Sequence, residues 1–310
     1  MTHAITDRCV LAVDIGGTGM KAALVDASGE LLRSEIWPTD AGRGPESVLD
    51  NLLDRSAELV AWSARPVAAV GLAVPGLVDA RNGIARWSAN VGWSELSVRD
   101  IAAERLGLPV VIGHDVGLGG LAEARLGAGR GVDDLLFVAI GTGIAAAILA
   151  GGELITGGAG QAGEIGHVRV DGHTEPCACG AVGCLETVAS AAAIARRFVA
   201  RGGPPGTDAA GVVARLGTDP VADAVWSEAI AALSSVLSAS VTLLAPDRLI
   251  IGGGLAAAGE QLLDPIRREL AVRPTVQPLP EIVPAQLGRQ AGCRGAGLIA
   301  WDLLHDEIDS

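Results

Sequence analysis

The feature that most constrains the fold of this chain occurs twice: an apolar run reaches a glycine turn and continues as a second apolar run. The first copy covers Val10 to Val25 and the second begins at Leu135. Apolar runs on either side of glycines predict paired β-strands joined by tight turns. The copies also end alike, in Gly-Glu-Leu-Leu at 29–32 and Gly-Glu-Leu-Ile at 152–155, with a small difference in turn length. Two copies of one α/β unit, facing each other across a cleft, would give this pattern. Chance similarity between two glycine turns is the alternative.

The rest of the chain alternates between helical and strand patterns. Helices are predicted at about 45–62, 98–106, 118–126, 221–245, after 259 and at about 295–305, and further strands at 30–37, 67–74, 110–113 and 249–251. The segment 75–93, with Trp87, Asn90 and Trp93, is predicted to be a loop. A length of 310 residues allows one large or two moderate domains. We expect an N-terminal α/β domain at 1–116, completed by the C-terminal helix at 294–310, and a larger α/β domain at 117–293.

Charge and hydropathy argue against several classes of protein. The net charge of −13 and the pI near 4.8 disfavour a nucleic-acid surface, which needs clustered Lys and Arg. The first apolar run, Cys9 to Ile15, is too short for a secretory signal. The uncharged stretch 135–152 contains Gly141 and Gly143, which favours two strands and a turn over a membrane-spanning helix. We therefore expect a cytoplasmic protein that binds neither nucleic acid nor membrane.

Three glycine turns follow strands and are candidates for binding phosphate, because glycine lets backbone N–H groups approach phosphate oxygens. Their residues are Gly16, Gly17 and Thr18, then Thr142 and Gly143, then Gly253 and Gly254. Asp14 precedes the first turn and is suited to hold Mg²⁺ through water. Lys21, the only lysine of the chain, offers a compact positive charge beside that turn. At each place an ordinary turn without a ligand is the alternative.

Asp115 follows the strand at 110–113 and precedes the helix at 118–126. An acid at this position ordinarily caps the helix. As a catalytic group, it would be a general base that accepts a proton from a sugar hydroxyl while the γ-phosphoryl group arrives. The sequence leaves both roles open.

A cluster of metal-ligand residue types lies between positions 167 and 184. It consists of His167, Cys177, Cys179 and Cys184, the Cys3His set that tetrahedral zinc favours. His173 competes for the fourth place because it is nearer to Cys177. A disulfide is disfavoured in a cytoplasmic chain, and a redox pair is more often spaced Cys-x-x-Cys. Four protein ligands close the site, so the metal is expected to organise the loop rather than to catalyse.

Two acids flank the cluster, Glu164 before it and Glu186 after it. Carboxylates held by a rigid loop suit a sugar, whose neighbouring hydroxyls are donors. His167 can serve twice, with one ring nitrogen on the metal and the other towards the sugar. Solvated charges on a loop are the alternative.

Together these residues resemble the ROK family (repressor, open reading frame, kinase). The resemblance rests on Gly163-Glu-Ile-Gly-His167, on Cys177-x-Cys179-Gly with Gly183-Cys184-x-Glu186, and on the first turn at Asp14 to Thr18, and it extends from about Val10 to the C-terminal helix. It implies an actin-like (ribonuclease H-like) fold of duplicated α/β domains with ATP and sugar in the cleft. It also implies ATP-dependent phosphorylation of a hexose, glucose to glucose 6-phosphate as first choice, with Mg²⁺ and a structural Zn²⁺ in a homodimer or homotetramer.

The resemblance assigns roles by position. Asp115 is implied as the catalytic base, Asn90, Glu164, His167 and Glu186 as sugar ligands, Gly16, Gly17, Thr18, Thr142 and Gly143 as phosphate contacts, and Gly253 and Gly254 as neighbours of the adenosine. This chain departs from the family pattern at His114 and Gly117, where Asn is common, and at Ala145 to Ala147, where further glycines are usual.

Other activities remain open at this point. A sugar-sensing repressor of the same family would need DNA-binding helices before Asp14, and 13 residues precede it. An actin-like ATPase without sugar chemistry does not explain the metal cluster and its two acids. Polyphosphate can replace ATP as donor, and N-acetylmannosamine, N-acetylglucosamine, mannose or fructose can replace glucose.

Overall fold

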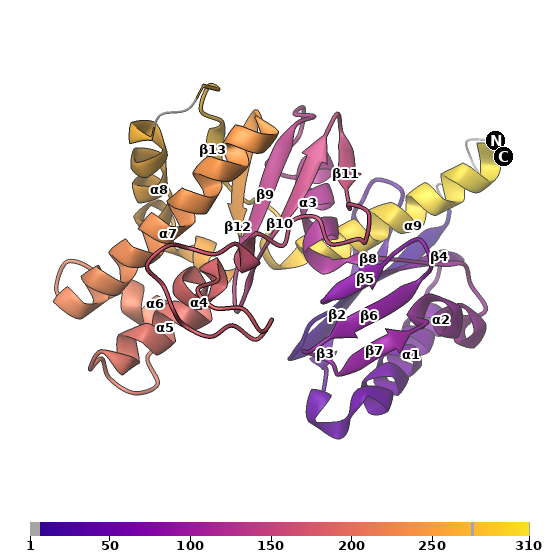
Figure 1. Ribbon diagram of the computed structural model, residues 1–310. Coiled ribbons are helices and arrows are strands. Elements are labelled where there is room, and N and C mark those ends of the chain that lie inside the picture. The colour runs from indigo at the N-terminus through magenta and orange to yellow at the C-terminus, as the bar shows by residue number, and fades with distance from the viewer. Residues whose placement is uncertain (1–6, 274–275, 310) are drawn as a thin grey trace. The chain divides into compact units, whose positions relative to one another are not determined.

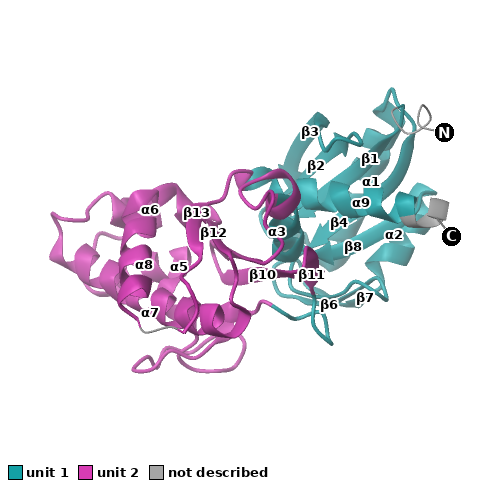
Figure 2. Ribbon diagram, turned by 90° about the horizontal axis from the view of Figure 1, so that it is seen from above, with its two compact units in different colours: residues 1–122, 156–162, 289–310 teal, residues 123–155, 163–288 magenta. Residues whose placement is uncertain are grey.

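The computed structural model describes residues 7–273 and 276–309 and divides into two compact units, coloured separately in Figure 2. Unit 1 comprises residues 1–122, 156–162 and 289–310, and unit 2 comprises 123–155 and 163–288. The division between residues 122 and 123 falls inside helix α3 (Asp115–Leu126). The sequence predicts a boundary between 116 and 117, before a helix expected to start at 118. Because the helix begins at Asp115 and runs on unbroken, the two units share it.

Unit 1 is built on a five-stranded sheet in the order β3-β2-β1-β4-β8, all labelled in Figure 2; Figure 1 labels β2, β3, β4 and β8 of this sheet. The strands are β1 (Cys9–Ile15), β2 (Gly19–Val25), β3 (Leu31–Pro38), β4 (Val67–Val74) and β8 (Val110–His114). The first three form an antiparallel meander, and β4 and β8 run parallel to β1. Every residue of β1 is buried, which explains why all of them except Asp14 are apolar.

Helices cover both faces of this sheet. Helices α1 (Pro45–Trp62) and α2 (Val98–Leu106) share one core with Leu11 and Val13 of β1. Helix α9 (Ala291–Asp309) contacts β1, β4 and β8, and the thiol of Cys293 points to the carbonyl oxygen of Ala12. A Cβ on Gly71, the β4 residue that pairs with Ala12, would collide with the backbone of Ala296 in α9. Because side chains alternate along a strand, this face is opposite to that of Leu11 and Val13, and α9 therefore lies on the opposite face from α1.

Unit 1 contains a second, small sheet where a loop was predicted. The segment predicted to be a loop forms β5 (Leu77–Asp79), β6 (Ile84–Ser88) and β7 (Trp93–Leu96), paired antiparallel in that order. These strands are short, and their residues do not alternate between buried and exposed, since Arg86 and Trp87 are both exposed. The sequence therefore lacks the period of two that predicts a strand. Asn90 lies in the turn between β6 and β7.

Unit 2 repeats the sheet of unit 1 strand for strand. Its order is β11-β10-β9-β12-β13, formed by β9 (Leu135–Ile140), β10 (Ile144–Ala150), β11 (Glu153–Ile155), β12 (Arg248–Gly252) and β13 (Glu281–Pro284). Again the first three are antiparallel and the last two run parallel to the first of them. Ile15 pairs with Met20 but Ile140 pairs with Ile144, so the second turn is one residue shorter. The duplicated actin-like fold is confirmed.

The helices of unit 2 are α4 (Leu185–Ala189), α5 (Ala191–Ala200), α6 (Ala209–Val213), α7 (Pro220–Leu244) and α8 (Glu260–Val272), beside the shared α3. Within the described chain, α7 alone has the length and hydropathy of a membrane span. Its apolar residues from Val225 to Val241 line the core of unit 2 against the sheet and α8. Burial in this core accounts for its composition.

Candidate functional site

The first glycine turn in unit 1 is bordered by an ion pair. Lys21 lies opposite Asp14 in the β1–β2 ladder, and its Nζ is 2.7 Å from Asp14 Oδ2. The Asp14 side chain is 12% exposed and that of Lys21 26%, so the pair is partly shielded from water. Lys21 therefore neutralises Asp14 locally instead of standing as an isolated positive charge.

Two residues distant in sequence support this turn. Thr39 is fully buried, its hydroxyl donates to the carbonyl oxygen of Gly16, and its N–H donates to that of Thr18. Asn90 lies on the other side, where a Cβ placed on Gly17 would come within 3.0 Å of the Asn90 Cβ. Glycine at 17 thus lets Asn90 approach the turn. Thr39 could not be predicted from the sequence, because no local pattern marks a single buried threonine after β3.

Asp115 lies at the same edge of the unit 1 sheet as Asp14. Ala73 of β4 pairs with Asp14, and Val74 pairs with His114 at the end of β8. The carboxyl ends of these parallel strands therefore meet at one edge, the usual place for ligands in such sheets. The Asp115 carboxylate is 30% exposed, and its Oδ1 accepts the N–H of Val116 at 2.7 Å.

In unit 2, the loop with Glu164 and His167 is held against β10 by two glycines. Gly163 has a φ of +96°, and a Cβ on it would collide with the carbonyl oxygen of Ala146. A Cβ on Gly166 would collide in the same way with the carbonyl oxygen of Ile144. Only glycine allows this close backbone approach, which fixes the positions of Glu164 and His167.

Glu186 of α4 is attached to the second glycine turn. Its Oε2 accepts the N–H of Ile144 at 3.1 Å, and a side chain at Gly143 would collide with the same oxygen. The third turn is close by, because Gly253, with φ of +79°, packs its Cα against the backbone of Ile140, the residue before the second turn. Unit 2 therefore brings together Thr142, Gly143, Gly253 and Glu186 at the carboxyl edge of its own parallel strands.

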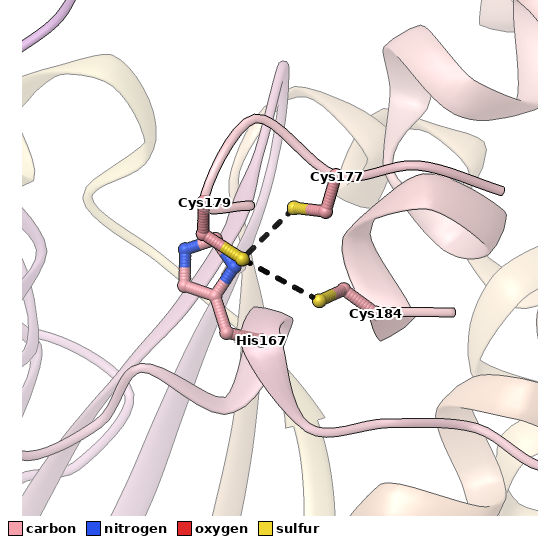
Figure 3. Close-up of side chains that lie close together, drawn as sticks. All are labelled: His167, Cys177, Cys179 and Cys184. Carbon is pink, nitrogen blue, oxygen red and sulfur yellow. Dashed lines mark hydrogen bonds between the residues drawn. The ribbon is translucent and has the colours of Figure 1, made fainter. Parts of the chain in front are cut away.

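The four residues of the Cys3His set converge on one point of unit 2 (Figure 3). Their ligand atoms all lie within 4.8 Å of one another, and Cys177 and Cys184 are buried. His173 is not part of this group, because its ring faces Glu175 at 3.7 Å instead. Among the described residues, His167 is thus the histidine that completes the cluster.

Distances within the cluster fit a tetrahedral metal. The Sγ atoms of Cys179 and Cys184 are 3.7 Å apart, and Cys177 Sγ is 3.6 Å from His167 Nδ1. Zinc bonds of about 2.0 Å to nitrogen and 2.3 Å to sulfur at tetrahedral angles require separations of about 3.5 to 3.8 Å. A disulfide would hold the sulfurs at about 2.05 Å. The residues present therefore fit a closed zinc site.

Protonation also bears on the cluster. Burial raises the pKa of the Cys184 thiol to about 12, and the other two sulfurs act in the same direction. The N–H of Ala181 lowers the pKa of Cys179. A divalent cation reverses the effect on Cys184, because thiolate is the form that binds metal. With Nδ1 of His167 facing Cys177, its Nε2 points to Glu164, 3.8 Å from Oε2.

Arg197 of α5 supports the metal loop and was missed from the sequence. Although it is 7% exposed, it contacts Glu175 of the loop at 3.3 Å and Glu228 of α7 at 2.7 Å. Its Nη1 also donates to the carbonyl oxygen of Val188 in α4 at 3.4 Å. A buried arginine with these partners connects three elements. Its only sequence signal is a charged residue on the apolar face of α5.

The duplicated sheets, with glycine turns and acids at the carboxyl edge of each, define an actin-like protein of two α/β units. The sequence model of the ROK family matches residues 10–302, and the chain belongs to this family. It is 33% identical to a glucokinase of Halalkalibacterium halodurans, over 94% of this chain and 95% of that one. It is also 33% identical to a kanosamine kinase of Amycolatopsis mediterranei, over 96% and 98%.

A solved structure gives the same result for the fold. The ROK family glucokinase of Streptomyces griseus, determined in complex with glucose and AMPPNP, superimposes with a TM-score of 0.83. It is 30% identical and covers 95% of this chain and 99% of its own. A match over 95% of this chain extends through both units.

Proposed function

We propose that this protein, an ATP-dependent sugar kinase of the ROK family, transfers the γ-phosphoryl group of ATP to the 6-hydroxyl of glucose. Support comes from the glucokinase relatives and from the carboxylate of Asp115 at the edge of the unit 1 sheet. That carboxylate is the observation that carries the proposal, because the reaction needs a group to take the hydroxyl proton.

In the proposed reaction, Asp115 removes the proton of the attacking hydroxyl. A bond forms between that oxygen and the γ-phosphorus, and the bond from this phosphorus to the bridging oxygen breaks, with its electron pair leaving on ADP. We assign Asp14 to Mg²⁺, and Gly16, Gly17, Thr18, Lys21, Thr142 and Gly143 to the phosphates. Gly253 and Gly254 are assigned to the adenosine. The exposure of Thr18, Thr142 and both of the last glycines supports these roles.

We assign Asn90, Glu164, His167 and Glu186 to the sugar. The carboxylates accept hydrogen bonds from hydroxyls. Gly163 and Gly166 fix the backbone that carries Glu164, and the Ile144 N–H holds the carboxylate of Glu186. Asn90 is placed by its contact with Gly17. His167 contributes Nε2–H, because its Nδ1 faces the sulfurs.

We further propose that the Cys3His cluster binds one structural Zn²⁺. Its support is the donor set and the fit of the sulfur and nitrogen separations to tetrahedral geometry. Binding through Nδ1 places the ring proton of His167 on Nε2, which makes that nitrogen a donor to an acceptor such as Glu164 or a sugar oxygen.

A coupled ADP-release assay over a panel of sugars tests the kinase proposal. The panel contains glucose, mannose, fructose, N-acetylmannosamine, N-acetylglucosamine and kanosamine, each with ATP or polyphosphate as donor. Asp115→Asn is expected to lower kcat by roughly 10² to 10⁴, the usual contribution of a general base. Asp50→Asn, an exposed acid on α1, is the matched control. Full turnover by Asp115→Asn contradicts the assignment of the base, and preference for another sugar contradicts glucose.

Metal analysis tests the zinc proposal separately. Protein never exposed to chelator is expected to contain about one equivalent of zinc, and Cys184→Ala less than half of one. Cys293→Ala removes a buried thiol outside the cluster and is expected to keep the metal. Equal metal content in the two variants contradicts the assignment.

A further inference from the structure

His114 ends β8 directly before Asp115, and both of its ring nitrogens are engaged. The N–H of Gly117 points to Nδ1 at 3.4 Å, and Nε2 lies 3.2 Å from Asp115 Oδ1. The side chain of His114 is 19% exposed. The imidazole therefore joins the first turn of α3 to the carboxylate assigned as the base.

These contacts determine which nitrogen of the neutral ring carries the proton. Nδ1 faces the N–H of Gly117 and acts as its acceptor, which leaves the ring proton on Nε2, 3.2 Å from Oδ1 of Asp115. The same oxygen accepts the N–H of Val116 at 2.7 Å. With the Val116 N–H and the His114 ring both in contact with Oδ1, rotation of the carboxylate about its terminal torsion, which is otherwise broad, is restricted.

We propose that His114 is a positioning residue for phosphoryl transfer, which holds Oδ1 of Asp115 so that Oδ2 receives the proton of the attacking sugar hydroxyl. This inference rests on the proposed role of Asp115 as the base. The hydroxyl proton moves to Oδ2 as the bond from oxygen to phosphorus forms, and the electron pair of the broken bond leaves with ADP. His114 keeps its own proton throughout.

Two effects of His114 oppose each other. A donor to a carboxylate stabilises the anion and makes it a weaker base, which slows proton transfer. A fixed carboxylate stays in reach of the hydroxyl, which speeds the transfer, and a small displacement of a catalytic group can lower a rate by as much as 10². A neutral imidazole is a weaker donor than a cation, so we expect positioning to exceed the loss of basicity.

Two variants separate positioning from a purely structural role. His114→Phe keeps a ring but removes both nitrogens. His114→Gln also loses the ring acceptor for the Gly117 N–H, but its amide nitrogen lies near the place of Nε2 and can donate to Asp115. Both variants therefore lose the cap on α3, and we expect both to lower Tm by a similar amount.

The kinetic constants of the full-length enzyme are then expected to differ between the two variants. His114→Phe should lower kcat about 10-fold, which corresponds to about 1.4 kcal/mol in the activation free energy, while KM for sugar and ATP changes less than twofold. His114→Gln should retain at least a third of the wild-type kcat. Equal kcat in the two variants, or a higher kcat in His114→Phe than in the wild type, overturns the inference.

Asp115→Asn, assayed beside them, distinguishes the two possible failures. If Asp115→Asn is inactive and His114→Phe is fully active, only the role of His114 is wrong. If Asp115→Asn turns over normally, the base itself is misassigned and the inference is overturned with it.

Discussion

Glu123 of α3 is fully buried, and its carboxylate accepts three hydrogen bonds from backbone N–H groups. Its Oε2 accepts the N–H groups of Ala128 at 2.9 Å and Gln286 at 3.1 Å, and its Oε1 accepts that of Leu287 at 2.7 Å. It thus fastens the turn after α3 to the segment that follows β13. We predict that Glu123→Gln, a change of one atom, strongly destabilises unit 2.

The magnitude follows from counting donors. The amide oxygen of Gln can replace Oε2 and keep two hydrogen bonds, but its NH₂ group must then face the N–H of Leu287. One bond to a charged acceptor is lost, worth about 1.5 to 3 kcal/mol, and a buried donor is left unpaired, which costs about 1 to 3 kcal/mol. We expect a total loss of about 2.5 to 6 kcal/mol. At about 2 to 4 °C for each kcal/mol in a unit of this size, Tm falls by roughly 5 to 24 °C.

Scanning calorimetry of the full-length protein is the suitable measurement, with urea unfolding as a second probe. Glu153→Gln, an exposed position on β11 of the same unit, makes the same chemical change and is expected to shift Tm by less than 2 °C. A Tm of Glu123→Gln within 2 °C of the wild type would refute the reasoning, because it would mean that a neutral amide satisfies the same three donors.

Three further predictions concern other residues. Burial raises the pKa of the Cys293 thiol from 9.0 to about 12, so its folded form favours the neutral thiol. Compared with Cys293→Ala, the wild-type protein therefore keeps its whole free energy of unfolding below pH 9. Between pH 9 and 12 this free energy should fall by about 1.4 kcal/mol per pH unit relative to the variant. If urea unfolding shows the same pH dependence for both proteins, the prediction is wrong. Gly143→Ala should raise the sugar KM about tenfold by displacing Glu186, and an unchanged KM in steady-state kinetics contradicts it. Arg197→Leu should lower the free energy of unfolding in urea by about 1 to 3 kcal/mol. Arg201→Leu, which removes a side chain that is 39% exposed, should lower it by less than about 1 kcal/mol. Equal losses in the two variants contradict the role of Arg197.

Features with a local pattern were predictable from the sequence. The two strand–glycine–strand copies, the long helix α7 and the Cys3His cluster depend on periodicity or on ligand spacing, and the structure places each where it was expected. The strands β5 to β7, Thr39 and Glu123 were not predicted. Each depends on partners far away in the chain, as when Thr39 bonds Gly16 or Glu123 bonds Leu287, and no local pattern encodes such contacts.

Predictions of assembly and of location depend on surfaces and partners rather than on the fold of one chain. The homodimeric or homotetrameric state and the cytoplasmic location stay predictions. Light scattering coupled to size exclusion separates a monomer from either assembly.

One short helix links the Cys3His cluster to Glu186, an acidic residue assigned to the sugar. Cys184 is the N-cap of α4, Glu186 lies in its first turn, and Arg196 and Arg197 bond the carbonyl oxygens of Thr187 and Val188 at its end. In the proposed zinc site, the metal on Cys184 would fix the start of the helix that holds Glu186, while the arginines fix its end.

Removal of the metal should act on sugar binding more than on the chemical step. Enzyme stripped of zinc by a chelator is expected to show a sugar KM raised at least tenfold, a KM for ATP changed less than threefold, and recovery when zinc is restored. The reason is that Glu186 and His167 lose their support, whereas Asp115 and His114 belong to unit 1 and do not depend on the cluster. A fall in kcat with an unchanged sugar KM would show instead that the metal acts on the reacting groups.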